Sequence, residues 1–470
     1  MWAGIILSLR QELIVTGIVI ILLFMKVGTR EYKNGVLLNV VNFLLLVNFA
    51  LGFWSCPDST LFSGMFHTNK LIVLEKNILN LGTLIVSLQA YNWLKDHRQA
   101  PEFYILLLST LVGFFFMISS GNLLMFYLGL ELSTIPLAAL AGFDLEKRQS
   151  SEAAMKFIMS SAFSSGLLLF GISMLYGTTG TLGFDAIAQR LDGSTLQLFS
   201  FILILSGFAF KISAVPFHLW TADVYEGAPV AVTAYLSVIS KGAVFFIFIQ
   251  ALYTFFKPLA GQWYRILVLL SVLTMITGNL FALRQDKLKR LLAFSSIAQS
   301  GFILAGITGS SRAGDASVIY FILVYVFSNL GAFGVVSFVS AQTGRESIDD
   351  YKGLYATNPL LSWVMAISLF SLAGIPPTAG FFGKFFLLMA GAGKGNYVFI
   401  SIAALNMVIS LYYYLRVIKA IFMDSQPVPM GKLKIPLLPN IAFMVCLAGI
   451  ILTGLMGWIY DYIFSLSLGF

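Results

Sequence analysis

Four ionisable side chains lie inside long apolar stretches of the sequence, where charge is otherwise rare. They are one acid, Glu131, and three lysines, Lys211, Lys241 and Lys384. A charge at the centre of a bilayer costs at least about 2.5–3.5 kcal/mol, so such residues usually mark an ion or proton pathway. Burial favours the neutral form of a lysine, and a group that exists in both forms can accept a proton and release it. These residues are therefore candidates for proton transfer.

Polar side chains recur near these charges at spacings that place them on one face of a helix. Stripes of this kind contain Ser237 with Lys241, Gln299 with its neighbouring serines, and Tyr325 with Ser328. Small polar groups also hold helices together in membranes, so each residue alone has two interpretations. Stripes directed at buried lysines favour water-lined relays. The candidate relay residues are His218, Tyr235, Ser237, Gln299 and Tyr325.

Proline interrupts two of the apolar stretches close to a lysine. Pro216 follows Lys211, and the run Gly374-Ile-Pro-Pro377 precedes Lys384. Proline cannot donate a backbone hydrogen bond, and inverted-repeat transporters place such breaks at their ion sites. His218, just past the first break, could relay protons or simply donate one hydrogen bond to a freed carbonyl.

Two acids follow the first break. Asp223 and Glu226 could attract protons to an uptake route, or they could belong to a solvated turn. Both interpretations stay open at this point.

The residues that usually bind redox cofactors are scattered. Cys56 and Cys446 form no Cys-x-x-Cys, and His67, His97 and His218 form no pair suited to haem. No glycine-rich dinucleotide motif follows a strand pattern. We therefore expect no metal and no redox centre in this chain, so that redox chemistry would occur on partner subunits.

The composition requires that these residues be positioned by membrane helices. Apolar residues make up 58% of the 470 residues and charged residues 11%, against roughly 45–50% and about 25% in soluble proteins. Stretches such as 36–54 are apolar on every face, which disfavours a β-barrel. The predicted fold class is an all-α polytopic membrane protein forming one membrane domain over 1–470, with its first helix retained and not cleaved as a signal peptide.

A hydropathy window of about 19 residues indicates about fourteen transmembrane helices. The predicted segments are 11–27, 35–54, 75–94, 103–120, 122–143, 153–176, 196–215, 229–256, 263–283, 290–308, 316–342, 359–391, 396–422 and 440–464. The broken segments are the seventh and the twelfth. Since they are five segments apart, two five-helix repeats, 103–256 and 263–422, would have opposite membrane orientations. The remaining parts would be 1–102, with three helices, and the last helix at 440–464.

Basic residues are distributed unevenly between the two sides of this predicted domain. The loops after odd-numbered segments contain 18 Lys and Arg residues, and the other side, with both termini, contains 8. Because cytoplasmic loops carry the basic excess, we expect a plasma (inner) membrane location with both termini outside. The net charge of +8 then reflects topology, and no nucleic-acid partner is expected.

Four stretches carry a resemblance to a known family. They are Leu128–Leu137, Gly207–Trp220, Glu226–Pro229 and Leu372–Lys384. With them, the sequence from the second to the fourteenth segment resembles the antiporter-like subunits of respiratory complex I. The resemblance implies a proton-translocating subunit of the NADH–quinone oxidoreductase, coupled to quinone reduction elsewhere in the complex.

The resemblance also implies roles and partners. Glu131 would pair with Lys211, Lys241 would link two half-channels, and Lys384 would serve the terminal one. Other membrane-arm subunits and the lipid bilayer would be the partners, and those subunits would use quinone and NADH or another electron donor. The alternatives are a subunit of a multisubunit Na⁺/H⁺ antiporter, or of a membrane-bound hydrogenase or ferredoxin-linked complex. With only one acid in the core, protons are favoured over sodium.

Overall fold

The computed structural model describes residues 2–28, 34–54, 58–425 and 430–469, and this part of the chain is predominantly helical. Cys56, one of the two cysteines considered above, lies outside the described residues. The described strands form one antiparallel hairpin, in which β1 (Ser59–Leu61) pairs with β2 (Phe66–Thr68). The hairpin follows the second predicted segment and leads directly into the third.

The helices follow one another with short connections. In chain order they are α1 (Trp2–Ser8), α2 (Arg10–Val27), α3 (Asn34–Leu51), α4 (Lys70–Lys95), α5 (Ala100–Ile118), α6 (Leu123–Ala141), α7 (Arg148–Thr179), α8 (Phe184–Arg190), α9 (Thr195–Lys211), α10 (Leu219–Gly227), α11 (Val230–Tyr235), the π-helix η1 (Leu236–Ser240), α12 (Lys241–Tyr253), the 3₁₀ turn η2 (Lys257–Leu259), α13 (Ala260–Leu283), α14 (Leu288–Ile307), α15 (Arg312–Thr343), the 3₁₀ turn η3 (Ile348–Tyr351), α16 (Leu354–Thr357), α17 (Pro359–Ala373), α18 (Ala379–Ala392), α19 (Tyr397–Phe422), α20 (Leu437–Leu455) and α21 (Gly457–Leu466).

Eleven helices in the described part are long and apolar enough to cross a membrane. Three further apolar helices, α9, α17 and α18, are shorter, because the seventh and twelfth segments are broken at the predicted places. The prediction of one continuous last helix at 440–464 is wrong: α20 ends at Leu455, and Met456 has non-helical dihedral angles before α21 begins. The number of fourteen spans stays a prediction.

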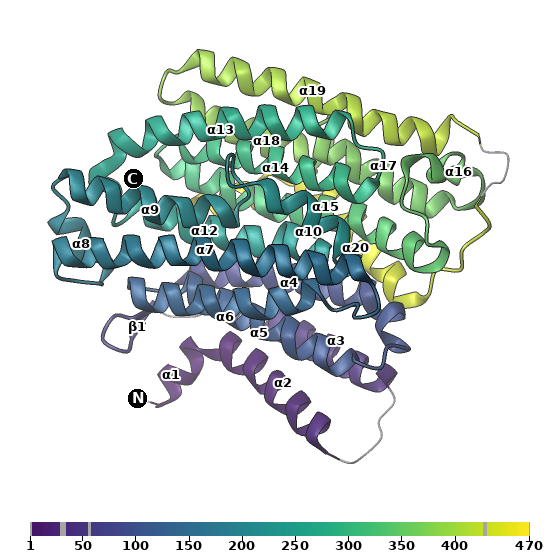
Figure 1. Ribbon diagram of the computed structural model, residues 1–470, viewed down its shortest axis with the longest axis horizontal. Coiled ribbons are helices and arrows are strands. Elements are labelled where there is room, and N and C mark those ends of the chain that lie inside the picture. Colours follow the sequence, from purple (N-terminus) through teal and green to yellow (C-terminus); the bar gives the residue numbers. More distant parts are fainter. Residues whose placement is uncertain (1, 29–33, 55–57, 426–429, 470) are drawn as a thin grey trace.

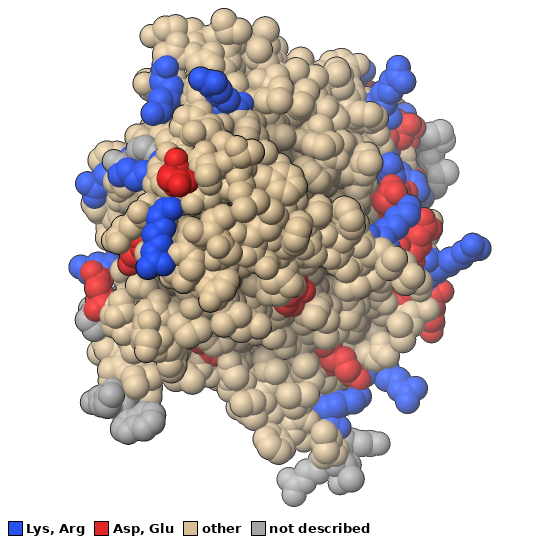
Figure 2. Space-filling model, turned by 60° about the vertical axis from the view of Figure 1, so that its left-hand side comes forward, with Lys and Arg blue, Asp and Glu red and all other residues tan. Residues whose placement is uncertain are grey.

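The long helices run side by side, and their connections gather at two ends of the bundle (Figure 1). One end, which we term the hairpin end, carries β1 and β2, α8 and the last turn of α21. The other, which we term the charged end, carries the C-terminus of α10, the N-terminus of α14, and α16. Figure 2 shows most charged side chains towards opposite margins of the molecule, with a broad face between them on which charged side chains are few.

Side-chain caps begin several helices at the hairpin end. The amides of Asn69, Asn122 and Asn396 accept hydrogen bonds from backbone N–H groups in the first turns of α4, α6 and α19, and Ser311 does the same for α15. Such a cap satisfies a donor that would otherwise be left unpaired, and replacing it by Ala typically costs about 1 kcal/mol. The polar residues therefore fix where these apolar helices begin.

Three elements are buried most completely in the interior of the bundle. Every residue in the apolar window of Val230–Tyr253 is buried, as are 94% of the residues in that of α14 and 89% in that of α15. By contrast, α3, α7 and α19 are buried over only 33–39% of their windows, so that one side of each faces outward. Lys241 therefore lies on an element covered by protein on all sides.

The structure corrects one expectation about charges near helix ends. Lys76, Lys156 and Arg416 stand near the ends of apolar stretches in the sequence, where long charged side chains are expected to reach the membrane surface. Lys76 is instead 1% exposed, and its Nζ atom lies 2.5 Å from Oε1 of Glu12 on α2. The reason is that α2 packs over this part of the bundle and supplies a buried partner, which apolar periodicity alone does not reveal.

Candidate functional site

Each of the three buried lysines lies at an irregularity in its helix. Lys211 is the last residue of α9, before the break at 212–218. Lys241 directly follows the π-helix η1, and Lys384 lies in the second turn of α18, after the break at 374–378. Breaks and π-turns leave main-chain carbonyls without their usual helical partners, which gives polar acceptors inside an apolar bundle.

Lys211 is held by two hydroxyl groups. Its Nζ atom lies 2.6 Å from Oγ1 of Thr134 on α6 and 3.0 Å from Oγ of Ser161 on α7. The freed carbonyl of Phe210 is satisfied by Trp220 Nε1 at 3.1 Å, a contact that the sequence interpretation considered for His218.

Glu131 lies one helical turn before Thr134, and its charge acts on Lys211. Its Oε1 atom is buried without a hydrogen-bond partner, and in the described part of the chain no ion pair within 4.0 Å joins it to Lys211. The expected pairing of Glu131 with Lys211 thus stays a prediction, with hydroxyl groups occupying the first contacts of the lysine.

Lys241 faces α14 and α10. Its Nζ atom donates to Oγ of Ser296 at 2.7 Å and lies 5.7 Å from the ring centroid of Tyr225. A cavity of about 10 Å³ separates Lys211 from Ser240, the residue before Lys241. That volume is roughly what one water molecule needs. The cavity therefore has room for one water molecule between Lys211 and the residue that precedes Lys241.

Lys384 bonds to the main chain at the twelfth-segment break. Its Nζ atom lies 2.6 Å from the carbonyl oxygen of Leu372 and 3.3 Å from that of Ala373, at the C-terminus of α17. A helix C-terminus carries partial negative charge and stabilises a cation. Nε2 of Gln299 donates to the same Leu372 oxygen at 3.0 Å. Lys384 and the polar stripe of α14 therefore share an acceptor.

Hydrogen bonds extend the stripe on α14. Tyr414 on α19 bonds to both Ser295, at 2.5 Å, and Gln299, at 3.2 Å. Because Ser295 and Ser296 are adjacent, polar groups continue from Lys241 through α14 to Lys384. The stripe on α14 was identified from the sequence, whereas Tyr414, Thr134, Ser161 and the two carbonyls were not. No spacing rule identifies partners that come from distant helices.

The remaining candidate relay residues differ in their contacts. Ser237 accepts a hydrogen bond from Asn329 at 2.8 Å, and Tyr235 accepts one from Thr110 at 2.8 Å. The hydroxyl of Tyr325 and Nδ1 of His218 are buried and have no hydrogen-bond partner in the described part of the chain. Neither group is joined by a direct bond to a lysine there, and their relay roles stay predictions.

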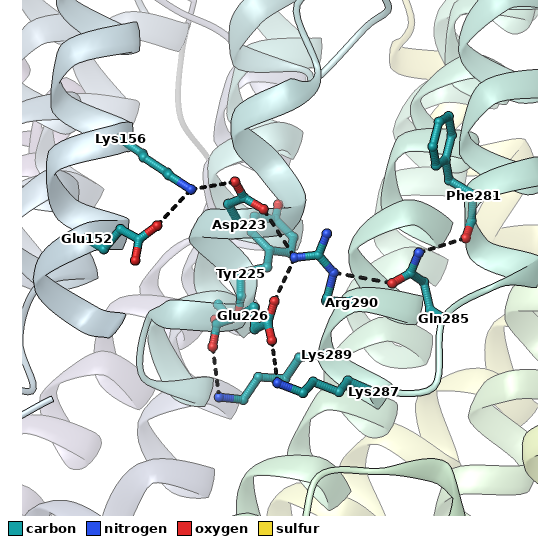
Figure 3. Close-up of polar contacts among 11 residues, drawn as sticks. Glu152, Lys156, Asp223, Tyr225, Glu226, Phe281, Gln285, Lys287, Lys289 and Arg290 are labelled. Carbon is teal, nitrogen blue, oxygen red and sulfur yellow. Dashed lines mark hydrogen bonds and ion pairs between the residues drawn. The ribbon is translucent and has the colours of Figure 1, made fainter. Parts of the chain in front are cut away.

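Asp223 and Glu226 belong to an ion-pair network at the charged end (Figure 3). Arg290 of α14 lies 3.1 Å from Asp223 and 2.6 Å from Glu226, both on α10. Lys156 of α7 lies 2.7 Å from Asp223, and Lys287 lies 2.6 Å from Glu226. The turn is therefore tied to α7 and α14 by charge.

The network lowers the pKa of both acids. Partial burial acts to raise the pKa of Asp223, but hydrogen bonds and charges from Lys156 and Arg290 outweigh burial and hold this pKa below its ordinary value of 3.8. In Glu226, Lys287 and Arg290 likewise outweigh burial and hold the pKa below 4.5. Both acids are therefore ionised at neutral pH.

Two cavities flank Glu226 at this end. One, of about 430 Å³, is also lined by Lys289, Glu346 and the start of α11; the other, of about 220 Å³, is lined by Glu152, Lys156 and Arg290. Charged and polar linings admit water. The larger cavity brings water-sized space to the start of α11, which leads through η1 to Lys241.

The part of the chain that contains the three lysines matches a known protein family. Residues 120–410, which include the three buried lysines, the partly exposed Glu131 and both breaks, match the family model described as NADH:quinone oxidoreductase/Mrp antiporter, TM. The chain belongs to this family. The predicted resemblance to antiporter-like subunits of complex I is thereby confirmed.

Curated relatives in the NADH:quinone oxidoreductase/Mrp antiporter family extend the likeness over almost the whole chain. NADH-quinone oxidoreductase subunit N of Phocaeicola vulgatus is 46% identical over 461 residues, covering 97% of each protein. NAD(P)H-quinone oxidoreductase subunit 2 of Gloeothece citriformis is 38% identical, covering 87% of this chain and 81% of that protein. Within the family, the length of the chain and the lysine on the broken twelfth segment had favoured subunit N, and the names of these relatives agree.

Solved structures share the fold. A chain of respiratory complex I from Thermus thermophilus superposes with a TM-score of 0.83 at 27% identity, covering 98% of this chain and 100% of that one. A chain of the Mrp complex from Dietzia sp. gives a TM-score of 0.87 at 21% identity, covering 99% and 96%. The second likeness concerns the fold alone.

Proposed function

We propose that this chain translocates protons as a membrane-arm subunit of a complex I-type NADH–quinone oxidoreductase. The observation that carries the proposal is the series of three lysines, each buried inside the bundle and held by hydroxyls or carbonyls. A proton would pass from the Glu131–Lys211 site to Lys241, and then along the polar stripe of α14 to Lys384.

The hydrogen bonds of the three lysines suit proton transfer better than a permanent positive charge. Hydroxyls and carbonyls can solvate an ammonium group, but they leave the lysine free to become neutral, whereas a close carboxylate would fix its charge. Moving one charge against the membrane potential requires about 2.3 kcal/mol per 100 mV, comparable to a change of roughly 1.7 pKa units. A change in the distance between Glu131 and Lys211 would supply a change of that size in a low-dielectric interior.

The energy would come from partner subunits. Quinone and NADH, or another electron donor, would react elsewhere in the complex, and the neighbouring membrane-arm subunits would transmit the change to Glu131 and Lys211. The charged end, with its excess of Lys and Arg, would face the cytoplasm of a bacterium, and the hairpin end the outside. The ion-pair network around Arg290 and its cavities would then lie at the side of proton uptake.

Substitution of the buried charges in the assembled complex tests the proposal. Lys211→Ala and Glu131→Ala should abolish proton translocation measured with a pH-sensitive dye in vesicles, while the exposed Lys432→Ala should leave it unchanged. Blue-native electrophoresis would establish that each variant assembles. Normal translocation by an assembled Lys211→Ala variant would exclude the relay.

The alternative, sodium translocation, makes a different prediction. A Na⁺/H⁺ antiporter subunit would move sodium without an electron donor, and a Na⁺ gradient alone would then drive proton movement in the same vesicles. We expect no such movement, because hard cations prefer several oxygen ligands with negative charge and the core offers one acid.

A further inference from the structure

Four ionisable side chains near the hairpin end are buried and have no part in the path proposed above. They are Glu12 on α2, Glu75 and Lys76 on α4, and Asp315 on α15, and each is at most 4% exposed. All lie in the first two turns of their helices, so that they are within about 10 Å of that end. They stand near the ends of apolar stretches, where charged side chains usually reach water, so the sequence alone did not indicate that they are buried.

Among the described residues, only one of these three acids forms an ion pair. Lys76 pairs with Glu12 at 2.5 Å, whereas neither Glu75 nor Asp315 has an ion pair within 4.0 Å in the described part of the chain. Asp315 Oδ2 accepts a hydrogen bond from the backbone N–H of Leu468 at 2.6 Å. Its Oδ1 atom is fully buried and has no partner among the described residues.

Glu75 and Asp315 also act on each other. Helices α4 and α15 pack side by side, and the two carboxyl groups interact electrostatically. The charge of Lys76 also acts on Glu75, but Lys76 is already paired with Glu12, so that one cation serves three buried acids. Glu75 and Asp315 therefore cannot both be ionised at acceptable cost, since each loses hydration and repels the other. The pair therefore has a physical reason to retain a proton.

We propose that Glu75 and Asp315 share one proton and form a second proton-transfer site, which receives protons from the Lys384 region and releases them at the hairpin end. Gly383, next to Lys384, packs on Phe321 so closely that an added Cβ would lie 2.9 Å from that ring. Asp315 is six residues before Phe321, about 9 Å along α15 towards the hairpin end.

The chemistry is a proton transfer in two steps. The Lys384 ammonium loses a proton through water, and the ionised member of the pair gains it as an O–H bond. The doubly protonated pair then returns one proton to water at the hairpin end. This role in release rests on the proposed function, whereas the shared proton itself does not.

Infrared spectroscopy of the assembled complex in membranes tests the shared proton directly. We expect a carboxylic acid C=O band that shifts when the membranes are moved into D₂O, because a site in contact with water exchanges its proton. This band should be lost in both Glu75→Gln and Asp315→Asn and kept in Asp461→Asn, a control at an exposed acid of α21 near the same end. A parent spectrum without the band, or two variants that keep it in full, would overturn the proposal.

Translocation measurements separate transfer from a structural role. Glu75→Gln keeps the shape and hydrogen bonding of a neutral acid but cannot release a proton, so translocation should fall severalfold, and Glu75→Asp should restore part of it. A Gln variant that translocates at the parent rate would overturn the role in release. Because the band is read without turnover, its loss in the variants would support the acid pair even if Lys211→Ala left translocation intact and the proposed function failed.

Discussion

At the scale of single residues, neutral groups hold the three lysines of the proposed path. Thr134, Ser161 and Ser296 supply hydroxyls to Lys211 and Lys241, and Lys384 uses carbonyls. Hydrogen bonds to charged groups contribute roughly 1.5–3 kcal/mol each. Each partner therefore affects how readily its lysine carries charge, and a single hydroxyl becomes a testable part of the path.

Ser296→Ala should slow translocation without preventing assembly. The substitution removes the hydrogen bond to Lys241, and a loss of about 1.5–3 kcal/mol corresponds to a roughly 10- to 150-fold slower step if that step limits the rate. The rate of proton translocation would be measured as proton flux in vesicles. Ser300→Ala is the matched control, because Ser300 is one turn away, equally buried, and its hydroxyl donates only to the carbonyl of Ser296 within the helix. Equal effects of the two substitutions would contradict the assignment.

The sequence predicted the buried charged residues in the middle of apolar stretches but not those near the helix ends. Lys211, Lys241 and Lys384 are conspicuous because apolar residues surround them on both sides. Glu75, Lys76 and Asp315 stand near helix ends, where the same residue types often reach water. Whether they do depends on which other helix covers them, and that is a property of tertiary packing, as the contact of α2 with Lys76 illustrates.

At the scale of the elements, irregular turns set the position of each lysine. Both proline breaks were predictable, because proline lacks the N–H that a helix needs. The π-helix at Leu236–Ser240 was not, since its residues fit an α-helix equally well and only packing against neighbours selects the wider turn. The division of the last segment at Met456 was hidden for the same reason.

Gly374→Ala should disturb the second break. Gly374 ends α17 with a φ of 86°, which L-residues adopt at a cost of about 1–2 kcal/mol, and an added Cβ would lie 3.2 Å from Cδ of Lys384. We expect a lower unfolding temperature of the complex and slower proton translocation. Gly166→Ala, in open space on α7, should change neither quantity. A fully active and equally stable Gly374→Ala variant would show that Lys384 does not depend on this turn.

The network that joins α10 to α7 and α14 should make stability depend on acid pH. The pKa values of Asp223 and Glu226 are lower in the folded protein than their ordinary 3.8 and 4.5, so folding favours the ionised acids. Their contribution is fully present above about pH 5 and is lost as the pH falls below about 4. Partly exposed ion pairs contribute up to about 1 kcal/mol each.

Arg290→Gln tests this dependence. Thermal unfolding of the parent and the variant should differ at pH 7, with the parent more stable, and the difference should shrink as the pH approaches 4. Lys434→Gln, an exposed lysine at the same end, should leave the unfolding curve unchanged at both pH values. A difference that stays constant with pH would mean that Arg290 acts through packing and not through charge.

At the scale of the whole molecule, charge gathers at two ends and in the interior. The face of Figure 2 on which charged side chains are few would contact lipid or neighbouring subunits, and large apolar side chains such as Phe43, Phe163 and Leu405 are exposed in the helices. The overall class was predictable from composition, because so few charged residues cannot cover a soluble protein of this size.

The predicted orientation can be measured with single cysteines. In a background without Cys56 and Cys446, Asp192→Cys at the hairpin end should react with a membrane-impermeant thiol reagent added outside intact cells. Lys432→Cys at the charged end should react only after the membrane is opened. Both positions are exposed. The opposite labelling pattern would show that the membrane topology is the reverse of the predicted one. The sides of proton uptake and release would then be exchanged.

The carbonyl contacts of Lys384 have a consequence for how this protein can vary. Its acceptors belong to the main chain of Leu372 and Ala373, and every amino acid supplies the same oxygen. Selection can therefore exchange these side chains for other apolar ones without changing the contacts. Insertion or deletion of one residue within the first turns of α18, between 379 and 384, would turn the lysine away from them by about 100°. Natural relatives should consequently tolerate substitution of Leu372 and Ala373 far better than a change in the length of these first turns of α18.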